Sequence, residues 1–259
     1  MDSCPIERFL EFDNQKQVRS DDYSIVNEEN IRKISKSGQK YRRILSLAGI
    51  NCAGKDTVIS FLESSRDDII RLKLHTSRPP RIGTQKDYPT MREIKDANSI
   101  GSDIGNYYFT SREYLEKNMD GSLLFRSKGD YYYALMMEEV VTKIFEARKH
   151  RKILLIPGVF ITCLILKKEL FKNMMIVYLR TPIKHLRERL EDRERLQHRR
   201  DILTPQEKIR IDRTIEDAQR YNVLAYVLYP LIINYIVNNE DGRLMDTIFK
   251  IESIIDEKL

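Results

Sequence analysis

The stretch Ile44-Leu45-Ser46-Leu47-Ala48-Gly49-Ile50-Asn51-Cys52-Ala53-Gly54-Lys55-Asp56-Thr57 decides the fold of this chain. The apolar run at its start predicts a short buried strand, and apolar residues at helical spacing from Asp56 to Leu62 predict a helix. The loop between them fits G-x-x-x-x-G-K, in which backbone N–H groups and the helix N-terminus bind phosphate and the lysine reaches the terminal phosphates. Strand, loop and helix in this order predict a phosphate-binding loop, or P-loop.

The loop also predicts ATP and Mg²⁺ as cofactors. Lys55 is the expected catalytic lysine, and the ATP contacts are expected from Asn51, Cys52, Ala53, Gly54, Lys55, Asp56 and Thr57. The residue after the lysine is usually Ser or Thr, whose hydroxyl helps to hold Mg²⁺. A carboxylate can serve instead, because Mg²⁺ prefers hard oxygen ligands, so we predict Asp56 and Thr57 as the metal ligands. Cys52 is interpreted as a small loop residue, with a redox role as the alternative.

Three further apolar runs predict buried strands: 153–156, 174–179 and 232–237. Helical segments separate them, and three helix starts are marked by capping residues at Thr110-Ser111, Thr181-Pro182 and Thr204-Pro205-Gln206-Glu207. Alternating strands and helices favour a parallel sheet with helices on both faces. The sequence therefore predicts an α/β fold of the P-loop NTPase type.

Composition limits the remaining possibilities. The 259 residues are 41% hydrophobic and 32% charged, and the formal net charge is +6. No run approaches the roughly 20 apolar residues that cross a bilayer, so we expect a cytoplasmic protein without a membrane partner. Three scattered cysteines favour neither disulfides nor a zinc site. Residues 1–41 are predicted to be a charged N-terminal extension, either a mobile tail or a short helical appendage.

A basic balance suits an anionic partner, either nucleic acid or a small phosphorylated ligand. Past the P-loop, Ser77-Arg78-Pro79-Pro80-Arg81-Ile82-Gly83 places two arginines three residues apart in a proline-stiffened turn. Two guanidinium groups so placed can bind one phosphate, although a solvated basic turn would have the same composition. Arg78 and Arg81 are the candidate ligands of an acceptor phosphate.

At this point the sequence resembles the guanylate kinase family over residues 42–259. The family's arginine turn is followed by a Tyr-x-Phe-x-Ser-x-Glu element, which is similar to 107–113 here, and by a Gly-Asn-Tyr-Tyr-Gly element, which is similar to 129–133. The resemblance implies a small acceptor-binding subdomain at about 78–135 and a helical lid at about 190–213. It also implies that Tyr107 and Tyr132 join Arg78 and Arg81 on the acceptor phosphate, with Tyr88 as a rival to Tyr107.

The resemblance extends to the lid and the last strand. Arg189-Leu190-Glu191-Asp192-Arg193 is similar to the family's Arg-Leu-x-x-Arg, and the helix from Ile209 to Ala218, which contains Arg213, is similar to its second lid helix. The resemblance implies that Arg193 and Arg213 are catalytic and that Asn238 lies near the ATP base. The other lid arginines are interpreted as solvated surface: Arg187, Arg195, Arg199 and Arg200.

The sequence departs from the family where the base is read. Leu123-Leu124-Phe125 stands where the family has a glutamate, Ala134 stands where it has a serine, and Leu155-Ile156-Pro157 replaces an Asp-x-Asp. A site that loses hydrogen-bonding groups loses discrimination between bases. The resemblance therefore implies a nucleoside monophosphate kinase with GMP or dGMP as the expected acceptor and with an altered acceptor pocket.

Three alternatives stay open. A relative of the family that phosphorylates ribose 1,5-bisphosphate also carries Gly-Lys-Asp, and its strand end is similar to 155–158 here. Guanylate-kinase-like modules of scaffold proteins bind phosphopeptides but lack the P-loop lysine that this chain has at Lys55. A nucleic-acid-binding role would depend on charge alone, without a supporting motif. The expected partners are small nucleotide substrates, and a homodimer is left open.

Overall fold

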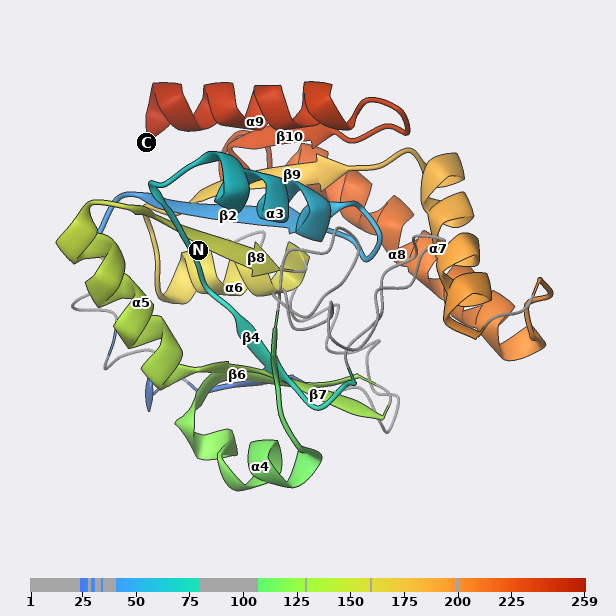
Figure 1. The fold of residues 1–259 in the computed structure, drawn as a ribbon, viewed down its shortest axis with the longest axis horizontal. Helices are drawn as coiled ribbons and strands as arrows, with labels where there is room; N and C mark the ends of the chain where they lie inside the picture. The colour runs from blue at the N-terminus through green and yellow to red at the C-terminus, as the bar shows by residue number, and fades with distance from the viewer. Residues whose placement is uncertain are drawn as a thin grey trace, which may run out of the picture.

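The computed structural model describes residues 24–27, 29–30, 34, 41–79, 107–128, 130–158, 160–198 and 201–259 (Figure 1). These residues form two sheets, flanked by helices. The larger sheet is parallel and has the strand order β10-β9-β2-β8-β3. Its strands are β2 (Ile44–Gly49), β3 (Ile69–Arg71), β8 (Ile153–Gly158), β9 (Met175–Arg180) and β10 (Tyr235–Asn238). The predicted α/β class is confirmed.

The order of the strands places a ligand crevice beside β2. Strand β2 lies between β8 and β9, and all six of its residues are buried. The helix after β2 is α3 (Lys55–Ser65), and the helix after β8 is α6 (Phe160–Glu169). Figure 1 shows α3 and α6 on opposite faces of the sheet. Where neighbouring parallel strands send their connections to opposite faces, a crevice opens at their carboxyl ends, and the predicted P-loop lies at this end of β2.

Helices cover both faces of the larger sheet, as predicted. On one face, α3 packs against α9 (Leu244–Lys258), and each presents an apolar stripe at helical spacing. On the other face lie α6 and α5 (Met137–His150) (Figure 1). Helices α7 (Ile183–His198) and α8 (Pro205–Val227) pack against each other beyond the carboxyl ends of the strands. No helix in the described part of the chain is long and apolar enough to cross a membrane.

Two of the three predicted helix starts are confirmed by their caps, whereas α7 begins at Ile183 and the Thr181 hydroxyl donates to the Ala53 carbonyl. Thr204 accepts a hydrogen bond from the Glu207 backbone and Glu207 accepts one from the Thr204 backbone, so the capping box of α8 is complete. Ser111 caps α4 (Arg112–Lys117) by accepting from the Tyr114 backbone.

The predicted strand at 232–237 begins later than its apolar pattern suggested. Ile232 and Ile233 donate to the Leu228 carbonyl at the end of α8, and pairing with β9 begins only at Asn234. An apolar run cannot distinguish a buried turn from the strand that follows it. The strand therefore starts three residues past the start of the predicted run, at Tyr235.

The second sheet was not predicted from the sequence. Its described strands have the order β1-β6-β7-β4-β5. They are β1 (Ser24–Val26), β4 (Leu74–Thr76), β5 (Tyr107–Phe109), β6 (Ser122–Lys128) and β7 (Tyr131–Met136), with a 3₁₀ turn, η2 (Met119–Gly121), before β6. Strand β1 pairs antiparallel with β6, so part of the segment 1–41 is integrated into this sheet. Strands β5, β6 and β7 of this sheet fall in the predicted acceptor-binding region at about 78–135.

Candidate functional site

The loop between β2 and α3 has the backbone geometry of an anion-binding site. Gly54 is left-handed (φ 84°), and Cys52 is also at positive φ (63°). The Ala53 N–H donates to the Ile50 carbonyl at 3.2 Å, which closes the turn. A chain that reverses in this way before a helix directs successive N–H groups to one point, where the helix N-terminus adds its positive dipole. Asn51, Cys52, Ala53 and Gly54 thus lie where phosphate binding was predicted.

Lys55 is held by its own loop. Its ammonium donates to the carbonyls of Gly49 at 2.9 Å and Ile50 at 2.7 Å. Burial lowers the pKa of Lys55; nearby Asp56 and two thiols oppose this shift, and the positive charge of Arg193 adds to it. Desolvating an ammonium is unfavourable, and phosphate oxygens would compensate for that cost. The carbonyls of Gly49 and Ile50 thus hold Lys55 at the loop where phosphate binding was predicted.

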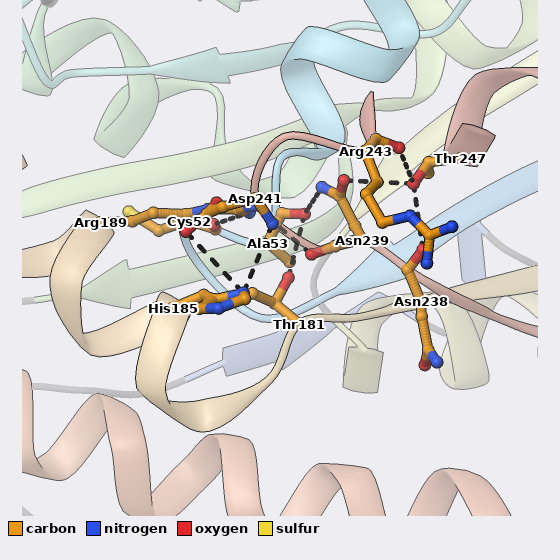
Figure 2. Close-up of polar contacts among 10 residues, drawn as sticks. All are labelled: Cys52, Ala53, Thr181, His185, Arg189, Asn238, Asn239, Asp241, Arg243 and Thr247. Atoms are coloured by element: carbon orange, nitrogen blue, oxygen red, sulfur yellow. Dashed lines mark hydrogen bonds and ion pairs between the residues drawn. The ribbon is translucent and has the colours of Figure 1, made fainter. Parts of the chain in front are cut away.

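One asparagine and two threonine side chains support the P-loop through hydrogen bonds (Figure 2). The Asn239 amide donates to the Ala53 carbonyl at 2.7 Å, and the Thr181 hydroxyl donates to the same carbonyl at 3.4 Å. The Thr247 hydroxyl donates to the Asn239 side-chain oxygen at 3.3 Å. Asn239, Thr181 and Thr247 are buried and come from three separate elements. The loop is consequently fixed before a nucleotide binds, which reduces the entropy lost on binding.

Gly54 cannot be replaced without strain. A Cβ at this position would lie 2.3 Å from the Asn239 amide nitrogen, and the left-handed backbone disfavours any side chain. We expect Gly54→Ala to lower the free energy of unfolding by about 1–3 kcal/mol and to weaken ATP binding. Denaturant unfolding and an ATP titration measure the two effects.

Gly242→Ala is the matched control. Gly242 is also left-handed (φ 76°), but a Cβ there would meet no atom within 4 Å. Gly242→Ala should lower the free energy of unfolding only through the strain of its left-handed backbone, and it should bind ATP as the unchanged chain does. Equal ATP affinity in both variants would contradict the proposed tight contact between the loop and Asn239.

Arg189 connects helix α7 to the P-loop. It donates to the carbonyls of Cys52 and Asn239, each at 3.4 Å, and forms an ion pair with Asp241 (Figure 2). The sequence-based prediction named Arg193 but not Arg189 as a functional residue. Arg189 is the first arginine of the Arg-Leu-x-x-Arg pattern, so the signal was present in the sequence. Arg189 thus contacts both the P-loop and the segment after β10.

Asp56, a predicted Mg²⁺ ligand, is in contact with a buried arginine. Arg71, at the end of β3, donates to Asp56 Oδ1 at 3.1 Å and to Glu63 Oε2 at 3.4 Å. The side chain of Asp56 is 49% exposed, so its second oxygen can reach solvent. That oxygen fits the hard-ligand preference of Mg²⁺. Thr57 is exposed on the first turn of α3, and its role as a ligand stays a prediction.

The acceptor side is built on aromatic rings. Arg78 is buried, and its guanidinium lies 5.2 Å from the Tyr107 ring and 5.7 Å from the Phe109 ring. Burial raises the pKa of Tyr107 well above its usual range, and the nearby carboxylate of Asp56 adds to the shift. Tyr107 therefore lies directly beside Arg78. Arg81 and Tyr88, the other predicted ligands in this region, lie outside the described residues.

Tyr132 and Tyr133 face opposite sides of β7. The Tyr133 ring lies 6.4 Å from that of Tyr107, whereas Tyr132 packs on Phe125 with ring centres 5.0 Å apart. The Tyr132 hydroxyl accepts from Arg112 at 2.6 Å. Because successive side chains of a strand alternate between its faces, only one of the two tyrosines can join Tyr107. The structure brings Tyr133 to the acceptor side and leaves Tyr132 in the small core beneath α4.

The remaining predicted residues belong to the lid and the last strand. Arg193 is partly buried, lies 3.6 Å from Glu194, and has a buried Nε without a hydrogen-bond partner among the described residues. Arg213 is exposed on α8, and it makes no hydrogen bond or ion pair within the described part of the chain. Asn238 is exposed, accepts from Arg180 at 3.5 Å, and points away from its neighbour Asn239 (Figure 2). Of the three, Arg193 alone is partly buried.

Comparison with known proteins places the fold. A crystal structure of guanylate kinase from Anaplasma phagocytophilum matches with a TM-score of 0.50 and 14% identity, covering 83% of this chain and 86% of that one. Shikimate kinases from Acinetobacter baumannii (16% identity, 87% of this chain, 99% of that one) and Bacteroides thetaiotaomicron (12%, 82% and 98%) match with TM-scores of 0.37. No protein-family model matches, and no curated protein matches. The chain has the fold of a P-loop kinase.

Proposed function

We propose that this protein transfers a phosphoryl group from ATP to a nucleoside monophosphate, with GMP or dGMP as the expected acceptor. The observation that supports the proposal is the pair of cationic groups at the two predicted phosphate sites: the partly buried Lys55, held by the carbonyls of its own loop, and Arg78, whose guanidinium lies 5.2 Å from the Tyr107 ring. A phosphotransferase needs one binding site for the donor phosphates and one for the acceptor phosphate, and the two must face each other across a single crevice.

The residues divide the chemistry among them. Lys55 and the loop N–H groups bind the β- and γ-phosphates of ATP, and Arg78 binds and orients the acceptor phosphate. Mg²⁺, when bound, would be held by Asp56 and Thr57 and would neutralise phosphate charge. Arg193 offers a guanidinium for the charge that develops on the transferring group. Positioning and electrostatic stabilisation account for most of the rate enhancement in phosphoryl transfer, so a separate covalent catalyst is not required.

A second candidate acceptor is ribose 1,5-bisphosphate. The positions that would read a purine by the family resemblance are apolar and buried here: Leu123, Leu124 and Phe125 on β6 and Ala134 on β7. Groups of this kind offer no hydrogen bond to a base. Ribose 1,5-bisphosphate would accept the phosphoryl group on an oxygen of its 1-phosphate, which is already ionised, so this transfer needs bound phosphates and no groups that read a base.

The acceptor is identified by measuring ADP release with ATP and a panel of acceptors. We expect activity with at least one purine monophosphate, GMP or dGMP above the others, and about 10²–10³-fold lower activity in Lys55→Ala. Activity confined to ribose 1,5-bisphosphate would favour the second candidate. ATP binding without transfer to any acceptor, in folded protein, would instead favour a non-catalytic binding module and contradict the proposal.

A further inference from the structure

Two glutamates and a histidine converge where α7 meets α8, away from the phosphate loop. Glu194 and His198 are four residues apart on α7 and so share one face of that helix. Glu207 lies in the first turn of α8. One ligand-type atom from each of Glu194, His198 and Glu207 lies within 4.8 Å of the other two. Nothing in the proposed phosphoryl transfer uses this cluster.

The distances suit a small cation. His198 Nε2 lies 3.3 Å from Glu207 Oε1 and 3.8 Å from Glu194 Oε2. Ligands at the usual 2.0–2.2 Å from a tetrahedral zinc ion lie roughly 3.3 Å from one another. Only small side-chain movements would therefore bring the three atoms onto one ion. Glu207 is held in place for this, because its Oε2 accepts from the Thr204 backbone at 2.8 Å while Oε1 faces the imidazole.

Burial adds a reason for a cation to bind. The side chains of Glu194 and Glu207 are 3% and 7% exposed, and buried carboxylates need a compensating positive charge. His198 is 47% exposed, which gives an ion access from solvent. Carboxylates together with an imidazole form a ligand set that Zn²⁺ accepts and that Mg²⁺ does not favour.

Two arginines already contact Glu194 and would compete with an ion. Arg210 donates to Glu194 Oε2, and Arg193 lies 3.6 Å from Oε1. The Arg210 side chain is 60% exposed, so it can turn into solvent, and a bound cation would then compensate the buried Glu194 carboxylate in its place. An ion that displaces Arg210 from Glu194 would leave the Arg210 guanidinium in solvent. Arg210 is thus the residue that sets how tightly the cluster binds metal.

We propose that Glu194, His198 and Glu207 form a three-ligand site for a zinc-type divalent cation, which joins the last turn of α7 to the first turn of α8. Water completes the coordination on the exposed side, as in other three-ligand zinc sites. The bound ion would hold together the two helices that carry Arg193 and Arg213, independently of any nucleotide.

The test is a titration of the untagged full-length chain with Zn²⁺, followed by calorimetry, in excess Mg²⁺. We expect one Zn²⁺ per chain and a higher thermal unfolding midpoint when it is bound. His198→Gln and Glu207→Gln should each weaken binding by about tenfold or more, since each removes a ligand. Arg210→Ala should strengthen binding, because the competing guanidinium is gone. Glu191→Gln, on the same helix but outside the cluster, should bind as the unchanged chain does.

Three outcomes would overturn the proposal. They are the absence of stoichiometric Zn²⁺ binding, equal binding by His198→Gln, and weaker binding by Arg210→Ala. His198→Gln keeps the three cysteines, so zinc held by thiols would persist in that variant and be recognised. Circular dichroism of each variant without metal verifies that it is folded. His198 is half exposed, which makes its replacement tolerable to the fold.

Discussion

Lys55→Ala is expected to lower kcat for phosphoryl transfer by about 10²–10³-fold, the effect of removing one preorganised donor from a transition state. The ammonium is buried beneath the loop and donates to the carbonyls of Gly49 and Ile50, so it is already positioned for phosphate. Steady-state kinetics at saturating ATP and acceptor measure the effect. Lys55→Met keeps the length of the side chain and separates loss of charge from loss of packing.

Lys172→Ala is the control for that experiment. Lys172 is an exposed lysine before β9, at the opposite end of the larger sheet from the P-loop. Its replacement should leave kcat unchanged. If Lys55→Ala retained the kcat of the unchanged chain while binding ATP, the loop would be a phosphate-binding element without a catalytic role.

Arg193→Ala is expected to lower kcat by about 10³-fold, with a much smaller effect on ATP affinity. Arginines that stabilise the transferring phosphoryl group contribute 10³–10⁵ in rate. Arg193 is partly buried on α7, and its buried Nε has no hydrogen-bond partner within the described residues. A group that acts mainly in the transition state changes kcat more than ground-state binding.

Arg195→Ala tests whether position, rather than charge, decides the effect of Arg193→Ala. Arg195 is on the same helix and pairs with Glu191 and Asp192 on the surface. We expect its removal to change kcat less than twofold, since surface ion pairs contribute little. An equal loss of activity in both variants would show that α7 acts through its general positive charge. A loss in Arg213→Ala as large as that in Arg193→Ala would require lid closure to bring the exposed Arg213 inward.

The larger sheet was predictable because its signals are local. An apolar run followed by glycines and a lysine identifies β2, the P-loop and α3, and the capping residues of α8 act within four residues of one another. The second sheet was not predictable. Several of its strand pairs join distant segments, such as Ser24 with Arg126 and His75 with Ala134, and β1, β4 and β5 are only three residues long. Short strands stabilised by distant partners leave little periodicity in the sequence.

The candidate site was likewise predictable only in part from the sequence. The P-loop residues follow from one contiguous motif. Arg71, Asn239 and Tyr133 were missed because their roles depend on which strand ends meet beside Lys55 and on which face of β7 each side chain occupies. Tyr132 and Tyr133 are neighbours in sequence, and only the direction of the pleat distinguishes them. A motif read without a register cannot make that choice.

Strand β1 also covers the backbone edge of β6. It covers β6 along Arg126, Phe125 and Leu124, while Asn30 donates to the carbonyls of Asp120 and Ser122. A shortened chain that begins after residue 41 would retain the whole P-loop and still bare the backbone edge of β6. Uncovered edges of that kind recruit strands from other molecules, so such a fragment would tend to aggregate even though its nucleotide-binding half remained complete.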